Sequence, residues 1–151
     1  PERLRIIIES LLTCSKTIPV VFPVHPRTRQ KLESISTFKA QLAGAPQFRL
    51  VNPVGYLDMV TLEKHAAVVA TDSGGVQKEA FFYGVPCVTL REETEWVELV
   101  DSGWNRLCPP ETPEAVAETI IGSIGTQGRT TQPYGHGDTA KRIVQILTSA
   151  N

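Results

Sequence analysis

The sequence is poor in cysteine, with only Cys14, Cys87 and Cys108 among its 151 residues. They lie far apart, so they form neither the paired spacing of a zinc site nor a dense disulfide framework. A sparse, odd number of thiols is typical of a protein that stays reduced in the cytoplasm, where Cys87 would be a small core residue. We therefore expect a cytoplasmic location and no metal site.

Charge of one sign and long apolar runs are also lacking. The net charge is −1, which gives no basic surface for nucleic acid. No stretch of about 18 apolar residues is present, and no basic-then-apolar leader precedes the chain, so we expect neither a membrane partner nor secretion. With 41% hydrophobic residues, the chain is long enough for one domain with a full core. Since it opens with Pro1-Glu2-Arg3 rather than Met, we expect it to be part of a longer polypeptide.

Apolar runs and helical patterns alternate along the whole chain. Strands are predicted within 18–24, 48–51, 66–70, 87–90 and 106–108, and helices over 1–12, 28–42, 56–64, 74 to about 84, 94–100, 113 to about 121 and 139–147. This alternation predicts an α/β fold, a Rossmann-like parallel sheet flanked by helices on both faces. Ligands of such sheets bind beyond the carboxyl ends of the strands, where His25, residues 52–56, residues 72–75 and residues 91–93 would lie.

The most informative stretch is the apolar run Ala66 to Ala70 followed by a polar and glycine-rich turn. Ser73 suits the N-cap of the helix that follows, which would end near Gly84. The first amides of a helix lack partners and carry about half a positive charge, so they can bind phosphate. Gly74 and Gly75 would allow close approach of a phosphate, because they have no Cβ.

Glu79 lies one turn after Gly75 on the same helix face, where its carboxylate could reach sugar hydroxyls. A carboxylate does not bind phosphate, so its presence beside a phosphate site indicates a nucleotide with a ribose diol. The alternative is that Ser73-Gly74-Gly75 is only a tight, well-capped connection and Glu79 a solvated helix residue.

The segments Thr71–Ala80, Gly84–Arg91 and Thr94-Glu95 together resemble the signature of the non-hydrolysing UDP-N-acetylglucosamine 2-epimerases. Pro133–Ala140 is similar to the closing motif of that family, whose last helix packs on the other domain. The resemblance covers nearly all of the chain. It implies one half of a glycosyltransferase-B architecture: residues 1–151 would be the carboxyl-terminal UDP-binding domain, without the amino-terminal catalytic domain.

The resemblance also implies roles for Ser73, Gly74 and Gly75 at the diphosphate, and for Glu79 at the ribose. Gly55, Tyr56 and Met59 lie in the turn that holds the base in this family. Some members have Gln and Phe where this chain has Val54 and Met59, so only backbone contacts carry over. From the residues alone, Tyr56 and Leu57 are equally compatible with the core of a short helix.

His25, Arg27 and Arg29 follow the first strand and could contact phosphate or sugar. The alternative is a hydrogen-bonded turn histidine followed by two solvated arginines. The resemblance implies a sugar or regulatory contact for His25, because in some bacterial members the matching histidine touches a second nucleotide-sugar.

Charged residues also follow the fourth predicted strand, where Arg91 and Glu95 are possible sugar contacts and a charged surface loop is the alternative. Asp72 we interpret as a turn residue that bonds local amides. Well-known family members have Thr-Glu-Arg where this chain has Thr94-Glu95-Trp96, which resembles the branch acting on diacetamido-uronic acid sugars.

The resemblance implies an isomerase that epimerises UDP-GlcNAc or a related UDP-sugar at C2, through elimination and re-addition of UDP. It implies no cofactor and no catalytic residue within this stretch, with the full-length enzyme as a homodimer. Two alternatives are the donor-binding domain of a UDP-sugar glycosyltransferase and a stand-alone nucleotide-binding module, which would require a gene product that begins near Pro1.

Overall fold

The computed structural model describes residues 2–35 and 37–149. Its helices are α1 Glu2–Cys14, α2 Pro26–Glu33, α3 Phe38–Ala43, α4 Tyr56–Lys64, α5 Gly74–Phe82, α6 Val97–Asp101, α7 Pro113–Ser123 and α8 Thr139–Ser149. Its strands are β1 Val20–Pro23, β2 Phe48–Val51, β3 Val69–Thr71, β4 Cys87–Thr89 and β5 Asn105–Leu107. Strands and helices alternate in the predicted order, and the α/β fold is confirmed.

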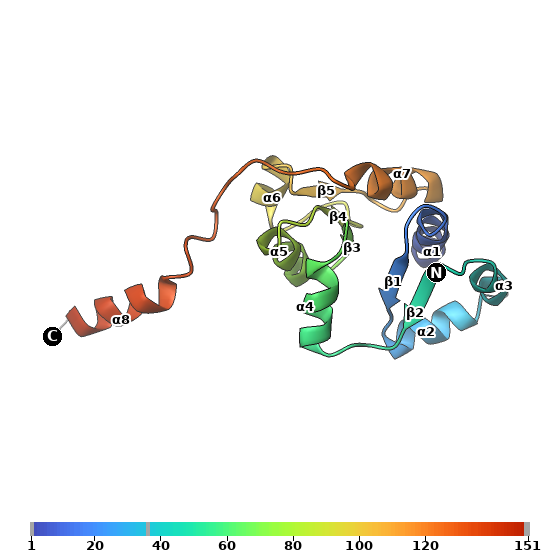
Figure 1. Cartoon of the computed structure of the whole chain (residues 1–151), viewed down its shortest axis with the longest axis horizontal. Helices are drawn as coiled ribbons and strands as arrows, with labels where there is room; N and C mark the ends of the chain where they lie inside the picture. The colour runs from blue at the N-terminus through green and yellow to red at the C-terminus, as the bar shows by residue number, and fades with distance from the viewer. Residues whose placement is uncertain (1, 36, 150–151) are drawn as a thin grey trace.

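All strand pairs are parallel, as predicted. They form two hydrogen-bonded sheets, one of β1 and β2 and one of β3, β4 and β5 in that order. Figure 1 shows β1 and β2 on one side of the body and the three-stranded sheet beside them. The single expected sheet is therefore divided in two, because among the described residues no hydrogen-bonded strand pair joins β1 or β2 to the other three strands.

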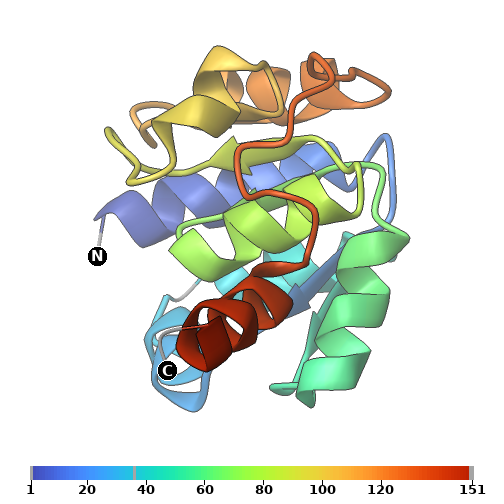
Figure 2. The same ribbon diagram turned by 90° about the vertical axis from the view of Figure 1, so that its left-hand side faces the viewer.

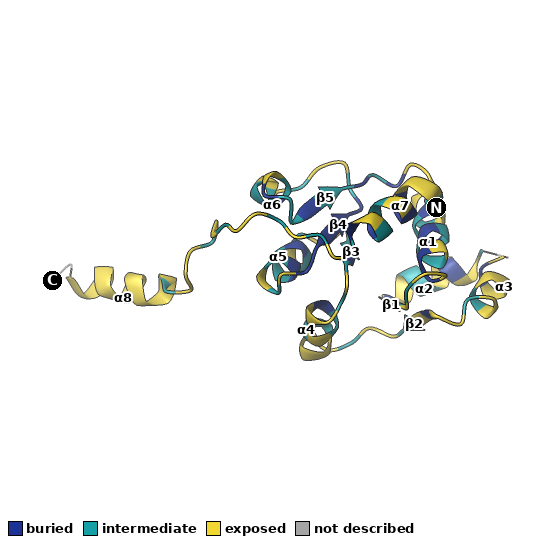
Figure 3. Ribbon diagram, turned by 45° about the horizontal axis from the view of Figure 1, so that its top comes forward, coloured by how far each residue is buried: buried dark blue, intermediate teal, exposed yellow. Residues whose placement is uncertain are grey.

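The three-stranded sheet is covered on both faces, which places its strands in the core. α5 and α7 both contact β4, and they lie on opposite sides of it (Figure 1). Successive residues of β4 face these two sides: Cys87 packs with Ala80 of α5, and Val88 packs with Val116 of α7. Figure 3 shows the buried residues concentrated there. This burial fixes β3 and its carboxyl end, from which α5 starts.

A second core joins α1, α2, α3 and the β1–β2 sheet around Leu32 and Phe38. The single helix predicted over 28–42 is wrong, because α2 ends at Glu33 and α3 begins at Phe38. The hydroxyl of Ser34 donates to the carbonyl of Lys31 at 2.7 Å and helps to close α2. Both pieces bury their apolar side chains in the same core, which is why the helical spacing continues across the break.

After α7 the chain crosses the molecule as an extended segment. A Cβ at Gly128 would lie 2.4 Å from Cδ1 of Trp104, so only glycine fits against that ring. The indole of Trp104 donates to the carbonyl of Arg129 at 3.0 Å. Further on, the ammonium of Lys78 lies 4.2 Å from the Trp96 ring centroid and 4.4 Å from that of Tyr134. The segment is therefore attached to the body at two points before α8.

Helix α8 extends away from the body (Figure 1); in the view of Figure 2 it lies in front of the other elements. None of its described side chains is buried, and Figure 3 shows it exposed along its length. Its apolar side chains Ile143, Val144, Ile146 and Leu147 are 52–69% exposed. Among the described residues, no helix is both long and apolar enough to cross a membrane.

Candidate functional site

The start of α5 leaves backbone donors without protein acceptors. Ser73 holds the predicted N-cap position with extended backbone, but its hydroxyl makes no capping hydrogen bond. The first backbone bond of the helix runs from the amide of Gln77 to the carbonyl of Ser73 at 3.3 Å. Within the described residues, no hydrogen bond occupies the amides of Gly74, Gly75 or Val76. Such a helix end attracts anions, because the amides and the macrodipole point the same way.

The turn before α5 is held by a residue that the sequence analysis did not select. The Ser73 amide donates to the hydroxyl oxygen of Thr71 at 3.0 Å. Asp72 was expected to bond the local amides; instead its side chain is exposed and lines a cleft, and Thr71 makes the bond. Because the Ser73 amide is bonded to Thr71, the free donors at the helix end are the next three amides, those of Gly74, Gly75 and Val76.

One side of the first turn of α5 is covered by Trp96. Its indole Nε1 donates to the carbonyl of Gly74 at 2.9 Å, and a Cβ at Gly74 would lie 3.2 Å from that nitrogen. Around Gly75 the space is open, since the nearest atom to a Cβ would be the Ser73 hydroxyl at 3.9 Å. Access to the free amides is therefore from the Gly75 side.

A buried polar network supports this arrangement from below. The side-chain oxygen Oε1 of Gln77 accepts from the hydroxyl of Thr94 at 2.6 Å and from Nδ2 of Asn105 at 3.0 Å. Asn105 Oδ1 in turn accepts from the hydroxyl of Thr89 at 2.9 Å. The network joins α5, β4, β5 and the Thr94–Trp96 turn. Gln77 is 0% exposed, which no local sequence pattern indicates, because glutamine is usually found at the surface.

Arg91 and Glu95 are brought together beside the same helix end. Arg91 Nη2 lies 2.9 Å from Glu95 Oε1, and hydrogen bonding from Arg91 lowers the pKa of Glu95. A Cβ at Gly74 would lie 3.5 Å from the other carboxylate oxygen, Oε2. Arg91 thus offsets a negative charge that would otherwise disfavour an anion at the amides.

The start of α4 also lacks a side-chain cap. Its N-cap is Gly55, and the first helical bond runs from the Met59 amide to the Gly55 carbonyl at 2.9 Å. Tyr56 and Leu57 are 69% and 77% exposed, so the interpretation of both as core residues is wrong. The charge of Glu79 raises the pKa of the Tyr56 hydroxyl, which shows that α4 and α5 present these two groups to the same region.

Glu63, on the inner face of α4, was also missed. It is 2% exposed, and neither carboxyl oxygen has a hydrogen-bond partner among the described residues. Burial first, and the charge of Glu79 second, raise the pKa of Glu63 to about 7. A buried glutamate is rare, and nothing in its sequence context distinguished it from the other acidic residues of the helices.

His25 belongs to the other sheet. It is the N-cap of α2, and its Nδ1 accepts from the amide of Arg27 at 3.3 Å. Arg29 Nη2 donates to Oδ1 of Asn52 at 3.2 Å. The hydrogen-bonded turn interpretation of His25 therefore describes its contacts, and none of its described contacts reaches the α5 start.

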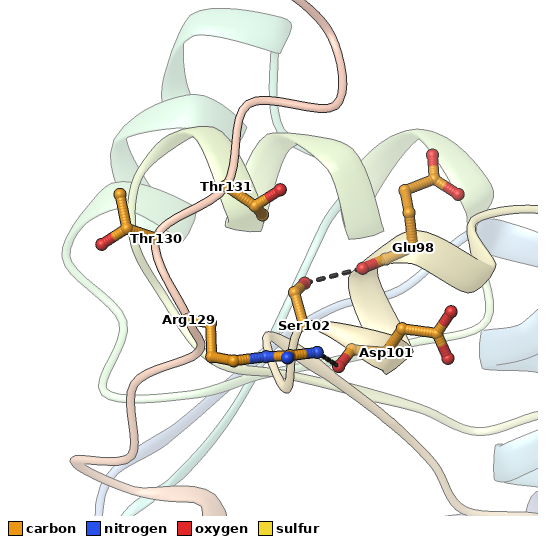
Figure 4. Close-up of a pocket in the computed structure, with 6 residues that line it drawn as sticks. All are labelled: Glu98, Asp101, Ser102, Arg129, Thr130 and Thr131. Carbon is orange, nitrogen blue, oxygen red and sulfur yellow. Dashed lines mark hydrogen bonds between the residues drawn. The ribbon is translucent and has the colours of Figure 1, made fainter.

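Two hollows lie near these elements. The larger, about 850 Å³, extends from α1 and α2 to the ends of β3 and β4, where Asp72 and Arg91 line it. It is a cleft at the carboxyl edge of the strands, next to the α5 start. The smaller, 370 Å³, lies between α6 and the segment 129–131 (Figure 4). It includes none of the predicted site residues, and Arg129 spans it to donate to the Asp101 carbonyl at 2.6 Å.

The predicted ligand residues therefore fall into two groups. One group belongs to the starts of the contacting helices α5 and α4, where Tyr56 and Glu79 interact, with Arg91 and Glu95 beside Gly74. The other is His25, at the start of α2. Among residues 2–35 and 37–149, no three His, Cys, Asp or Glu side chains gather as a metal site. The α4–α5 region can bind an anion at its amides and hydroxyl groups at Glu79.

Comparison with known proteins gives a consistent result. A family model described as UDP-N-acetylglucosamine 2-epimerase matches residues 1–148. A UDP-N-acetylglucosamine 2-epimerase homolog of Methanococcus maripaludis is 42% identical over 97% of this chain and 40% of its own length. The UDP-2,3-diacetamido-2,3-dideoxy-D-glucuronate 2-epimerase of Pseudomonas aeruginosa is 43% identical, with the same two coverages.

Solved structures agree. The Methanocaldococcus jannaschii UDP-GlcNAc 2-epimerase, in complex with UDP-GlcNAc and UDP, matches with a TM-score of 0.82 and 35% identity over 98% of this chain and 41% of that one. The chain thus spans about 40% of the length of the relatives that it matches.

Proposed function

The chain belongs to the UDP-N-acetylglucosamine 2-epimerase family, and we propose that it is the UDP-binding part of an enzyme that inverts C2 of a UDP-N-acetylhexosamine. The family assignment favours this function over the two alternatives, a glycosyltransferase and a stand-alone module. Within such an enzyme the chain would be the carboxyl-terminal domain, and an amino-terminal domain would face its cleft.

The observation that carries the proposal is the uncapped start of α5. Within residues 2–35 and 37–149, the amides of Gly74 and Gly75 donate no hydrogen bond, and the hydroxyl of Ser73 does not cap the helix. A ligand would therefore displace no protein partner from these groups. A diphosphate bound there receives several hydrogen bonds along the helix axis. When the bond between the sugar and UDP breaks, negative charge develops on that diphosphate, and fixed amide dipoles stabilise it without rearrangement.

The ribose and base would lie between α5 and α4. Glu79 is one turn beyond the amides, where an ionised carboxylate can accept from both ribose hydroxyls. The base would lie at the α4 start, against the backbone of Gly55 and the side chains of Tyr56 and Met59. The exposure of Tyr56, 69%, supports this placement, since an aromatic ring in water is available to a base.

In the proposed reaction the C2 proton is removed while the C1–oxygen bond breaks, giving a glycal and UDP. UDP then adds back to C1 and a proton returns to C2 on the opposite face. The groups that move the proton would come mainly from the amino-terminal domain. Arg91 and Glu95 would contact the sugar, and His25 a sugar or a regulatory nucleotide-sugar.

The sugar is proposed to be UDP-GlcNAc or a diacetamido-uronic acid relative. The second possibility is supported by Thr94-Glu95-Trp96 and by the similarity to the Pseudomonas protein. We further propose that the exposed apolar side of α8 packs on the amino-terminal domain and that the full-length enzyme is a homodimer. A cytoplasmic location is favoured because all three cysteines are free and buried.

The reaction is tested on the full-length protein with candidate UDP-sugars in heavy water. Deuterium at C2 of recovered UDP-sugar is the expected result, because the proton removed exchanges with solvent before its return. Transfer of the sugar to an acceptor without label at C2 would instead favour a glycosyltransferase.

The ribose role is tested by Glu79→Ala, with calorimetric titration of UDP. We expect a loss of roughly 1–3 kcal/mol in binding free energy from charge-assisted hydrogen bonds. Glu118→Ala is the control, since Glu118 is exposed on α7 and should leave UDP binding unchanged. Equal affinities of the two variants would remove Glu79 from the site.

A further inference from the structure

The buried carboxyl group of Glu63 lies behind the proposed ribose site. It is 2% exposed, on the face of α4 that packs against α5. Both of its oxygens lack a hydrogen-bond partner among the described residues. An ionised carboxylate without partners in such a place would be very costly, so the group needs either a proton or a partner.

Among the described residues, the groups that interact electrostatically with Glu63 are acidic or weakly acidic. From α5 the carboxylate of Glu79 raises the pKa of Glu63. Burial first, and the charge of Glu63 to a smaller extent, raise the pKa of the Cys87 thiol on β4. The charge of Glu79 first, and those of Tyr83 and Glu63 to a smaller extent, raise the pKa of Tyr56 on α4. Of these groups Glu79 is the half-buried carboxyl group that the proposed function uses, so it is the acceptor that a proton on Glu63 would serve.

We propose that Glu63 is a positioning residue for Glu79: its protonated carboxyl group donates a hydrogen bond to the Glu79 carboxylate and holds it towards the ribose. This inference rests on the proposed role of Glu79 in binding UDP. One oxygen of Glu79 accepts the proton of Glu63, and both oxygens keep lone pairs for the ribose hydroxyls. Glu63 itself does not touch the ligand.

The arrangement makes nucleotide affinity depend on pH. Below neutrality Glu63 is protonated and orients Glu79. As the pH rises through about 7, the pKa of Glu63, the donor is lost and two neighbouring carboxylates repel each other. Affinity therefore falls with rising pH.

The test is calorimetric titration of the intact protein with UDP-GlcNAc at pH 6.0, 7.0 and 8.5. This probe is chosen because its diphosphate is a diester and does not titrate in this range, unlike that of UDP. We expect affinity to decrease about tenfold from pH 6.0 to 8.5, the size of one charge-assisted hydrogen bond.

Two variants separate positioning from packing. Glu63→Gln keeps a donor and cannot ionise, so it should bind as the wild type does at pH 6.0 and lose the pH dependence. Glu63→Met keeps the volume without a donor, so it should bind about tenfold more weakly at pH 6.0 and also show a flat profile. Glu118→Gln, on the exposed side of α7, should keep the wild-type slope.

The outcomes are distinct. A flat wild-type profile, or a slope that persists in Glu63→Gln, overturns the positioning role and leaves the proposed function standing. Absence of UDP-GlcNAc binding by the wild type at pH 6.0 contradicts the proposed function, and the positioning role with it.

Discussion

Two helices that follow strands of the same sheet, α5 after β3 and α7 after β5, begin in opposite ways. In α7 the hydroxyl of Thr112 accepts from the Ala115 amide at 3.2 Å, Pro113 has no amide proton, and Glu114 places a carboxylate in the first turn. Among the first residues of α7, Pro113 thus has no donor and the amides of Ala115 and Val116 are bonded to Thr112, and the dipole is matched by the helix's own acid.

In α5 none of these features is present. Ser73 does not cap, the first two helical residues are Gly74 and Gly75, and the first turn has no acid. Helix α2 resembles α7, since His25 caps it and Pro26 follows, and α4 resembles α5 in lacking a side-chain cap. The difference teaches that the same kind of strand–helix connection can satisfy its first amides within the protein, as at α7, or leave them available to a proposed ligand, as at α5.

The strongest test of this difference gives the first turn of α5 the acidic residue that α7 already has. Gly75→Asp places a carboxylate among the free amides, where it should lower UDP affinity at least about 100-fold, roughly 3 kcal/mol, by occupying the donors and repelling the diphosphate. Folding stability should stay equal or rise, because an acid in the first turn favours the helix. Calorimetry and thermal unfolding measure the two quantities on the same sample.

Gly75→Asn is the matched control, of similar size but without charge. It should lose clearly less affinity than Gly75→Asp. Unchanged UDP binding by Gly75→Asp would show that the diphosphate does not bind at this helix end.

The pH dependence of folding stability also distinguishes the α4–α5 region, which contains Glu63, from α7. The pKa of Glu63 is raised from 4.5 to about 7, so the folded state holds a proton that the unfolded state releases above 4.5. Its contribution is therefore complete below pH 4.5 and is lost as the pH rises to about 7, by up to about 3 kcal/mol. Denaturant unfolding at pH 5 and 7.5 should show the loss in the wild type, and a smaller one in Glu63→Gln.

The cap residues sharpen the comparison through a pair of matched substitutions. Thr112→Ala should lower the free energy of unfolding by about 1 kcal/mol and leave UDP affinity unchanged, because it removes a capping bond far from the ligand. Ser73→Ala should do the reverse, with stability nearly constant and about 1 kcal/mol lost in UDP binding. Chemical denaturation and calorimetry test both, and equal behaviour of the two variants would show that the helix starts do not differ in role.

The smallest effect concerns glycines. Gly122→Ala in α7 meets no atom within 4 Å, so it should stabilise the fold by roughly 0.5 kcal/mol through helix propensity, with UDP binding unaltered. Gly75→Ala has similar free space and should be tolerated by the fold, while its methyl group hinders the diphosphate. Thermal unfolding with and without UDP would expose the contrast, which fails if the nucleotide stabilises both variants equally.

Much of the fold could be predicted because local patterns agree with burial. The bounds of β2 and α4 match their predictions, since turn residues delimit both segments. The break between α2 and α3 escaped prediction, because Leu32 and Phe38 keep helical spacing while one common core buries both. The division of the sheet depends on pairing between distant strands, which no local pattern reports.

For the site, the sequence identified the α5 start because glycine and polar residues after an apolar run have a direct physical meaning. It did not reveal Glu63 or the Gln77 network, because burial of a polar side chain depends on which elements pack against it. Trp96 was noted only as a departure from a motif, whereas its indole bonds the first carbonyl of α5.

The contact of Gly128 with Trp104 has a consequence for the proposed packing of α8 on the amino-terminal domain. Since the chain is fastened at Arg129 and again at Tyr134, most of the long connection from α7 has already lost its freedom before α8 begins. The entropy cost of ordering that connection is therefore incurred during folding, and not when α8 docks. Loosening it by enlarging Gly128 should therefore weaken the proposed packing of α8 on the amino-terminal domain.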